Sequence, residues 1–246
     1  MNIAQLASQL KSTPAARILS EENRLYFTGF PSSNGTLLVT PEETAFVTDS
    51  RYFEAACNTV TEAQVILQDR VYQQIFDFLQ KHNCTEILVE SERMTLSELN
   101  KWRKMLPTYS FNVSNRLDTL ANGLREVKCE AEVEKMQKAQ DIAEKALEEL
   151  LHILKPGVAE RDLANELEYL MRKFGADGIS FDTIVVSGAN SSKPHGVPGG
   201  KLVEEGDFVT IDFGAIYGHY HSDCTRTFAV GMPTEELAGI LAGMLG

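Results

Sequence analysis

Two aspartates, Asp212 and Asp223, each lie in a run of residues typical of a half-buried strand, and a glycine-containing turn separates the two runs. A hairpin with its turn at residues 217–218 would place Asp212 directly opposite Asp223. The Cβ atoms of such a pair lie about 5 Å apart, and two like charges there are destabilising. A cation between the carboxylates removes the repulsion, and a hard divalent metal ion is the usual choice. The two aspartates are therefore a candidate metal site.

The residues around Asp212 favour its burial. It lies between Ile211 and Phe213, so its side chain points to the face opposite these apolar neighbours. An unpaired buried carboxylate is costly, and it either protonates or recruits a cation. Period two places further small or polar residues on the same face, namely Thr210, Gly214, His221 and Thr225. The alternative is structural, with one aspartate in a turn and the other paired with Arg226 or a nearby lysine.

A histidine, His195, lies in a short loop just before the aspartate hairpin. Pro194 and Pro198 stiffen this loop, and Gly196 allows the backbone to approach a ligand closely. A lone loop histidine is most often an exposed residue without a catalytic role. A stiff loop of small residues beside two carboxylates favours a substrate contact instead, and His195 is the candidate catalytic and substrate-binding residue.

The composition excludes several classes of partner. The chain has 246 residues and a net charge of −12, and no stripe gathers its basic residues on one face, so we expect no nucleic-acid partner. No apolar stretch approaches the roughly 20 residues of a membrane helix, so we expect no membrane association. The four cysteines are scattered without metal-ligand or disulfide spacing, which predicts free thiols and a cytoplasmic location.

The first half of the chain alternates strand and helix patterns, which predicts a small α/β domain over residues 1–122. The expected strands are Leu37–Val39, Ala45–Val47 and Glu86–Glu90, and the expected helices are Ser50–Cys57, Val71–Lys81 and Ser97–Met105. A turn at Asn122 and Gly123 is expected to mark the domain boundary.

The second half, residues 126–246, predicts an α+β domain that ends in the aspartate hairpin. A long helix from Arg125 to about Leu154 has an apolar stripe at spacings of three and four, and a second helix covers Glu160–Phe174. The charged faces of both helices are expected to be solvated. A strand at Phe181–Val186 and a loop at Ser187–Ser192 follow, and the sequence from Pro233 predicts the start of another helix.

Three motifs together resemble a known family. They are the loop Pro194–Pro198, the strand Val209–Gly214 and the strand His221–Thr227. They resemble the proline-directed metallopeptidases of the pita-bread fold, the aminopeptidase P and Xaa-Pro dipeptidase (prolidase) group. The first half is similar to the creatinase-type N-terminal domain that precedes the catalytic domain in that group, so the resemblance covers nearly the whole chain.

The resemblance implies hydrolysis of the peptide bond preceding proline, in proline-containing peptides, by two divalent metal ions. Manganese is the expected metal, with cobalt or zinc as alternatives. By this resemblance Asp212 would bind one metal, Asp223 would bridge both, and His195 would contact the substrate or the tetrahedral intermediate. The resemblance also implies a homodimer for the full-length form. Aminopeptidase and dipeptidase share these motifs, so both activities remain open.

The resemblance further implies a histidine and two glutamates as metal ligands on later strands. The chain is expected to be a C-terminally truncated member that contains the first half of the pita-bread domain and has little or no peptidase activity alone. Two other hypotheses remain: a non-catalytic binding protein on the same scaffold, and a metal-free creatinase-like hydrolase acting on a small C–N substrate. Loss of activity with chelator and its rescue by manganese would support the metallopeptidase alone.

Overall fold

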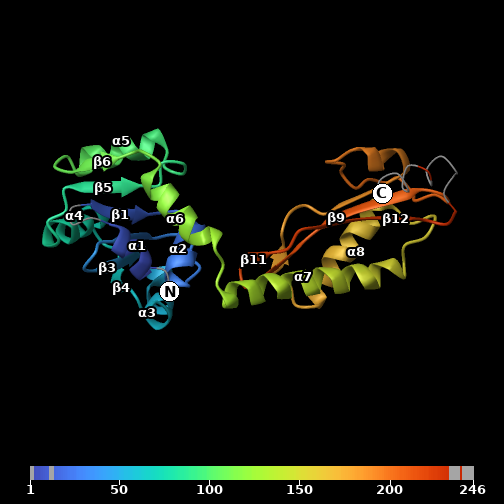
Figure 1. Cartoon of the computed structure of the whole chain (residues 1–246), viewed down its shortest axis with the longest axis horizontal. Helices are drawn as coiled ribbons and strands as arrows, with labels where there is room; N and C mark the ends of the chain where they lie inside the picture. The colour runs from blue at the N-terminus through green and yellow to red at the C-terminus, as the bar shows by residue number, and fades with distance from the viewer. Residues whose placement is uncertain (1–2, 11–13, 233–238, 240–246) are drawn as a thin grey trace. The chain divides into compact units, whose positions relative to one another are not determined.

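The computed structural model describes residues 3–10, 14–232 and 239. The chain divides into two compact units, Met1–Val127 and Lys128–Gly246 (Figure 1). Within the part of the chain that the structure describes, the first unit contains two buried apolar clusters and the second contains one. Among the described residues, no helix is both long enough and apolar enough to cross a membrane.

The first unit is built on one six-stranded mixed sheet with the strand order β4-β3-β2-β1-β5-β6. Its strands are β1 (Pro14–Ile18), β2 (Thr36–Val39), β3 (Thr44–Thr48), β4 (Gln64–Leu67), β5 (Glu86–Val89) and β6 (Ser110–Asn112). Its helices are α1 (Ile3–Gln9), α2 (Glu21–Thr28), α3 (Ser50–Thr59), α4 (Val71–Lys81), α5 (Leu96–Met105) and α6 (Arg116–Glu126).

Apolar clusters cover both faces of this sheet, which is why its central strands are buried along their whole length. Because side chains alternate between the two faces along β1, Ala16 and Ile18 lie in one cluster and Ala15 lies in the other. The expected α/β class, with strands and helices interleaved, is confirmed for this unit. The expected helix Val71–Lys81 is α4 to the residue, and the other expected strands and helices of this half match their counterparts to within two residues at each end.

The expected turn at Asn122 and Gly123 is wrong. Both residues lie inside α6, which buries Leu117 and Ala121 in the core of the first unit. The apolar contacts of this helix outweigh the local preference of an Asn-Gly pair for a turn. The long second-half helix also begins later than expected, at Glu130 rather than Arg125. The break between the two compact units falls at Val127 and Lys128.

Gly123 gives a direct test of this helix assignment. A methyl group at Gly123 would meet no atom within 4 Å, so Gly123→Ala should raise the free energy of unfolding of the first unit by about 0.5–1 kcal/mol. Gly29 has equally open surroundings but a φ of +68° at the C-cap of α2, so Gly29→Ala should lower it by about 1–2 kcal/mol. Urea titrations followed by the fluorescence of Trp102, the single tryptophan, measure both changes. Destabilisation by Gly123→Ala would contradict the helical assignment.

The second unit packs two helices against small antiparallel sheets. The helices are α7 (Glu130–Leu151) and α8 (Glu160–Lys173), and a short 3-10 helix, η1 (Gly188–Ser192), follows the strand β8. The strands are β7 (Gly178–Ile179), β8 (Ile184–Ser187), β9 (Phe208–Phe213), β10 (Ala215–Tyr217), β11 (Tyr220–His221) and β12 (Cys224–Ala229). They form two sheets with the orders β12-β9-β8 and β11-β10-β7.

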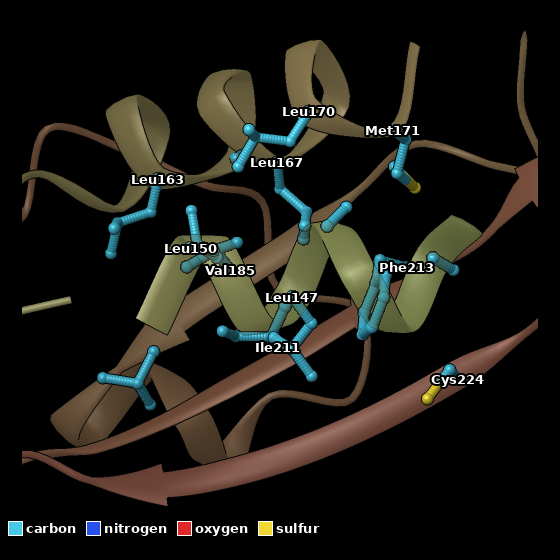
Figure 2. Close-up of a cluster of buried hydrophobic side chains, with 14 of the residues drawn as sticks. Leu147, Leu150, Leu163, Leu167, Leu170, Met171, Val185, Ile211, Phe213 and Cys224 are labelled. Atoms are coloured by element: carbon cyan, nitrogen blue, oxygen red, sulfur yellow. The ribbon is translucent and has the colours of Figure 1, made fainter. Parts of the chain in front are cut away.

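The core of the second unit lies between the two helices and the strands (Figure 2). Leu147 and Leu150 of α7 and Leu167 of α8 pack with Ile211 and Phe213 of β9. Alternation along β9 follows from this packing, because its odd-numbered residues are buried and its even-numbered residues are only partly buried. The face of β9 that carries Asp212 is thus turned away from the helices. The expected second helix is confirmed as α8, while the helix expected from Pro233 lies outside the described residues.

Candidate functional site

The aspartate hairpin is present, but its register differs from the expected one. Asp212 pairs with Thr225 across β9 and β12, and Ile216 pairs with His221 across β10 and β11. The turn therefore lies at residues 218–219 rather than 217–218, and Asp212 does not lie directly opposite Asp223. The partner of Asp212 is shifted by two residues, and a two-residue shift keeps the side chain on the same face. Asp223 thus remains a diagonal neighbour of Asp212 across the hairpin.

Local backbone requirements explain this register. Gly218 and His219 have φ values of +54° and +69°, and positive φ at both central residues is what a two-residue type I′ hairpin turn requires. Gly214 separates β9 from β10, and a methyl group there would lie 2.1 Å from the backbone oxygen of Ser222. The close approach of the two strands at Gly214 leaves no room for a side chain beside the position of Asp223.

One pocket of about 530 Å³ brings the three candidate residues together. His195, Asp212 and Asp223 all line it, although they come from a loop, from β9 and from the junction between β11 and β12. The other lining residues are Phe181, Asp182, Thr183, Ile184, Gly196, Val197 and Pro198. The sequence thus identified residues that share one cavity, even though the predicted pairing of the aspartates was wrong.

The polar contacts of Asp212 come from hydroxyl groups. The Thr225 hydroxyl donates to Asp212 Oδ1 at 2.8 Å, and the hydroxyls of Thr210 and Thr227 lie 3.0 Å apart one step along the same face. Within the described residues, neither Asp212 nor Asp223 forms an ion pair, and Arg226 donates to the backbone oxygen of Thr225 instead. The structural alternative, in which a guanidinium of Arg226 neutralises an aspartate, is not seen.

His195 is exposed and lines this pocket, while Gly196 beside it is buried. A methyl group at Gly196 would lie 2.6 Å from a side-chain carbon of Val186, so the loop packs directly against β8. The register keeps His221 on the face expected for it, because its partner Ile216 lies four residues from Asp212. It is exposed on β11, however, and is not among the residues that line the pocket.

Sequence reasoning missed Glu160. The charged faces of α7 and α8 were expected to be solvated, but Glu160, the first residue of α8, is fully buried. Its carboxylate accepts hydrogen bonds from the backbone and side chain of Ser187, from Asn190 and from the backbone of Gly199. Burial raises the pKa of Glu160, and these hydrogen bonds lower it further than burial raises it, so its pKa lies below the ordinary value. An acidic residue in the first turn of a helix is an ordinary feature, so no local signal distinguishes Glu160.

The donor set of the pocket fits a hard divalent cation in part. Two carboxylates without a basic partner are suitable ligands for such ions. Among the described residues, however, no three His, Cys, Asp or Glu side chains converge closely enough to hold a metal ion together. A cation held by Asp212 and Asp223 would keep water at most of its coordination positions. Such an ion lowers the pKa of bound water and polarises a carbonyl group.

Two family descriptions match the chain. The Creatinase/Prolidase N-terminal domain matches residues 5–127, and metallopeptidase family M24 matches residues 134–244. An uncharacterized peptidase of Bacillus subtilis is 39% identical over 228 residues, covering 91% of this chain and 63% of the relative. A putative Xaa-Pro aminopeptidase of Mycoplasma genitalium is 34% identical, covering 93% of this chain and 63% of the relative.

Solved structures agree with this assignment along almost the whole chain. The Xaa-Pro dipeptidase from Bacillus anthracis superposes with a TM-score of 0.90 at 33% identity, covering 97% of this chain and 67% of that one. The X-Pro aminopeptidase from Thermotoga maritima gives a TM-score of 0.87 at 32% identity, covering 96% of this chain and 68% of that one.

The chain spans about two thirds of the length of these relatives. The expected fold class is confirmed: a creatinase-type domain is followed by part of a pita-bread domain. The chain therefore belongs to metallopeptidase family M24 and contains a Creatinase/Prolidase N-terminal domain.

Proposed function

We propose that this protein contributes to metal-dependent hydrolysis of the peptide bond preceding proline. The observation that carries the proposal is the single pocket lined by His195, Asp212 and Asp223, with neither carboxylate in an ion pair among the described residues. Relatives named Xaa-Pro aminopeptidase and Xaa-Pro dipeptidase support the substrate class, and both activities remain open for this chain.

Each of the three residues has a distinct proposed role. Asp212 and Asp223 would be the ligands that this chain supplies to divalent ions, and manganese is the metal we expect. The Thr225 hydroxyl orients Asp212 by donating to its Oδ1 atom, which leaves Oδ2 for a cation. His195, exposed at the pocket on a loop packed against β8, donates a hydrogen bond to the substrate carbonyl oxygen as negative charge develops there.

The proposal also covers the cellular location of the protein, its oligomeric state and the activity of the 246-residue chain alone. We place the protein in the cytoplasm, which agrees with its four free cysteines, and we expect a homodimer for the full-length form. We also expect the 246-residue chain to have little or no peptidase activity alone, because two carboxylates hold divalent ions only weakly.

A metal-dependence assay tests the proposal. The full-length gene product should release proline from Ala-Pro or cleave an Xaa-Pro-Xaa tripeptide, lose this activity with chelator and regain it with Mn²⁺. Hydrolysis that persists in chelator would contradict the proposal, and so would peptide binding without cleavage, which is the behaviour of a non-catalytic binding protein. Measurable turnover by the purified 246-residue chain would overturn the expectation that it is inactive alone.

A further inference from the structure

One buried carboxylate holds both ends of the loop that carries His195. Glu160 Oε1 accepts from the backbone N–H of Ser187 at 2.8 Å, where β8 ends, and Glu160 Oε2 accepts from the backbone N–H of Gly199 at 3.2 Å. The segment between these two anchors contains η1 and the stiff residues around His195. A single side chain on α8 therefore connects the entry and the exit of this loop.

The two carboxylate oxygens of Glu160 have different hydrogen-bond partners. Oε1 also accepts from the Ser187 hydroxyl at 3.0 Å and from the Asn190 side chain at 3.2 Å, so three of the four donors converge on one atom. Among the described residues, Oε2 accepts only from the Gly199 amide. A carboxylate accepts at both oxygens and satisfies all four donors. The three N–H donors, from Ser187, Asn190 and Gly199, cannot accept a hydrogen bond from an N–H or O–H group placed at the same atom, whereas the Ser187 hydroxyl can.

Backbone hydrogen bonds also connect α8 to the exit of the loop. The Glu160 N–H donates to the backbone oxygen of Lys201 at 3.0 Å, and the Arg161 N–H donates to that of Gly199 at 3.0 Å. These contacts fix the first turn of α8 to the exit of the loop. Because helix N-termini have unsatisfied N–H groups, the loop backbone also completes the start of the helix.

An ion pair between Lys201 and Asp207 also supports the loop. Lys201 Nζ donates to the Ser187 hydroxyl at 3.1 Å and to Asp207 Oδ2 at 2.8 Å. The Asp207 carboxylate in turn lies against Gly188, where an added methyl group would be 2.6 Å from its Oδ1 atom and the φ of +53° already favours glycine. The start of the loop is thus packed between two carboxylates and one ammonium group.

We propose that Glu160 is a positioning residue for His195, which it holds at the pocket by tying Ser187 to Gly199. The catalytic part of this inference rests on the proposed function, since it assumes that His195 contacts the substrate. Glu160 itself does not line the pocket, so its effect passes through the loop backbone. Loss of the connection should leave the loop free to move away from β8 while the helices and strands keep their places.

Glu160→Gln is the sharpest test because it keeps the size of the side chain and changes one acceptor into a donor. If the oxygen of the new side chain faces Ser187, its NH₂ group faces the N–H of Gly199. If the amide is reversed, the NH₂ group faces the three donors of Ser187 and Asn190 instead. The first orientation loses fewer hydrogen bonds, so we expect the contact between residue 160 and Gly199 to break. Asp162→Asn is the matched control, because Asp162 is an exposed acid in the same first turn of α8 and the substitution removes the same charge.

Hydrogen exchange and histidine NMR of the 246-residue chain measure the protection of the loop amides and the surroundings of His195. In Glu160→Gln we expect about 10–100-fold faster exchange at the amide of Gly199, as for loss of one hydrogen bond to a charged group. The imidazole signals of His195 should shift, whereas exchange within α8 should change little. Asp162→Asn should leave both signals as in the parent chain.

Ser187→Ala keeps the test informative if Glu160→Gln does not fold. It removes one hydroxyl donor to Glu160 and the acceptor for Lys201, while the backbone N–H of Ser187 remains. We expect a smaller acceleration of exchange over residues 188–199 than in Glu160→Gln. Unchanged exchange at Gly199 and unchanged His195 signals in a folded Glu160→Gln or Ser187→Ala variant would overturn the proposal.

A kinetic measurement on the full-length gene product separates this inference from the proposed function. Displacing His195 should lower kcat by about 10–100-fold with a smaller change in KM, because the lost contact forms as charge develops on the substrate oxygen. An unchanged kcat in an active parent would overturn the role of Glu160. Absence of peptidase activity in the parent itself would overturn the proposed function, while the exchange measurement would still decide whether Glu160 fixes the loop.

Discussion

Replacing either Asp212 or Asp223 by asparagine should weaken the binding of Mn²⁺ to the 246-residue chain by at least about tenfold. Both carboxylates line one pocket, and no basic side chain among the described residues neutralises either of them. An amide group has the size of a carboxylate but carries no charge and offers one oxygen, so it is a much weaker ligand for a hard cation. Titration of free Mn²⁺ by electron paramagnetic resonance measures the loss.

Asp182 provides the matched control for this experiment. It lines the same pocket but is not one of the two proposed ligands, so Asp182→Asn removes the same charge without removing an expected ligand. Its effect on Mn²⁺ binding should stay within about twofold. Equal losses in all three variants would mean that the pocket attracts cations only through its general negative charge. No loss in Asp212→Asn and Asp223→Asn would contradict the assignment of these residues as metal ligands.

The second large effect concerns the fold of the first unit, where Arg17→Met should raise the free energy of unfolding by about 1–4 kcal/mol. Arg17 lies on the central strand β1 and is only 2% exposed. Its Nε and Nη1 atoms are buried and have no hydrogen-bond partner among the described residues. The guanidinium stacks on the ring of Trp102 at 3.6 Å, and burial lowers the pKa of Arg17 to about 9.

The cost of this buried charge explains the expected gain. A flexible apolar side chain of similar length fills the same space and keeps a contact with Trp102, while it leaves no unpaired donor in the core. Because Trp102 is the single tryptophan, its fluorescence during urea unfolding reports on the first unit alone. Lys104→Met, on the exposed side of α5, controls for the loss of one positive charge. Destabilisation by Arg17→Met relative to this control would show that the guanidinium has partners that stabilise the core.

Much of the secondary structure follows from local patterns. The helix α4 begins at Val71, the first residue of its apolar spacing of three and four, and ends two residues after the last, Leu79. The helix α8 follows the spacing of Leu163, Leu167 and Leu170 to within one residue of the expected end. These helices were predictable because a core-facing stripe is visible within one window of sequence. The turn expected at Asn122 and Gly123 failed because the helix there is set by contacts with the rest of the first unit.

The candidate site was predictable for a related reason, and only in part. The face of Asp212 follows from the buried residues on either side of it, and an error of two residues in register preserves that face. The register itself depends on the turn at Gly218 and His219 and on the close approach at Gly214, which no alternation pattern reveals. Glu160 escaped notice because its partners lie 27 to 39 residues away in the chain.

Crystals of the chain soaked in Mn²⁺ and measured near the manganese absorption edge test whether Asp212 and Asp223 together hold a divalent ion. We expect an anomalous peak in the pocket, bound by the carboxylates of both Asp212 and Asp223, with the imidazole of His195 facing it across the cavity. An anomalous peak bound elsewhere while the pocket stays without one, or the two carboxylates pointing apart in the presence of saturating Mn²⁺, would contradict this expectation.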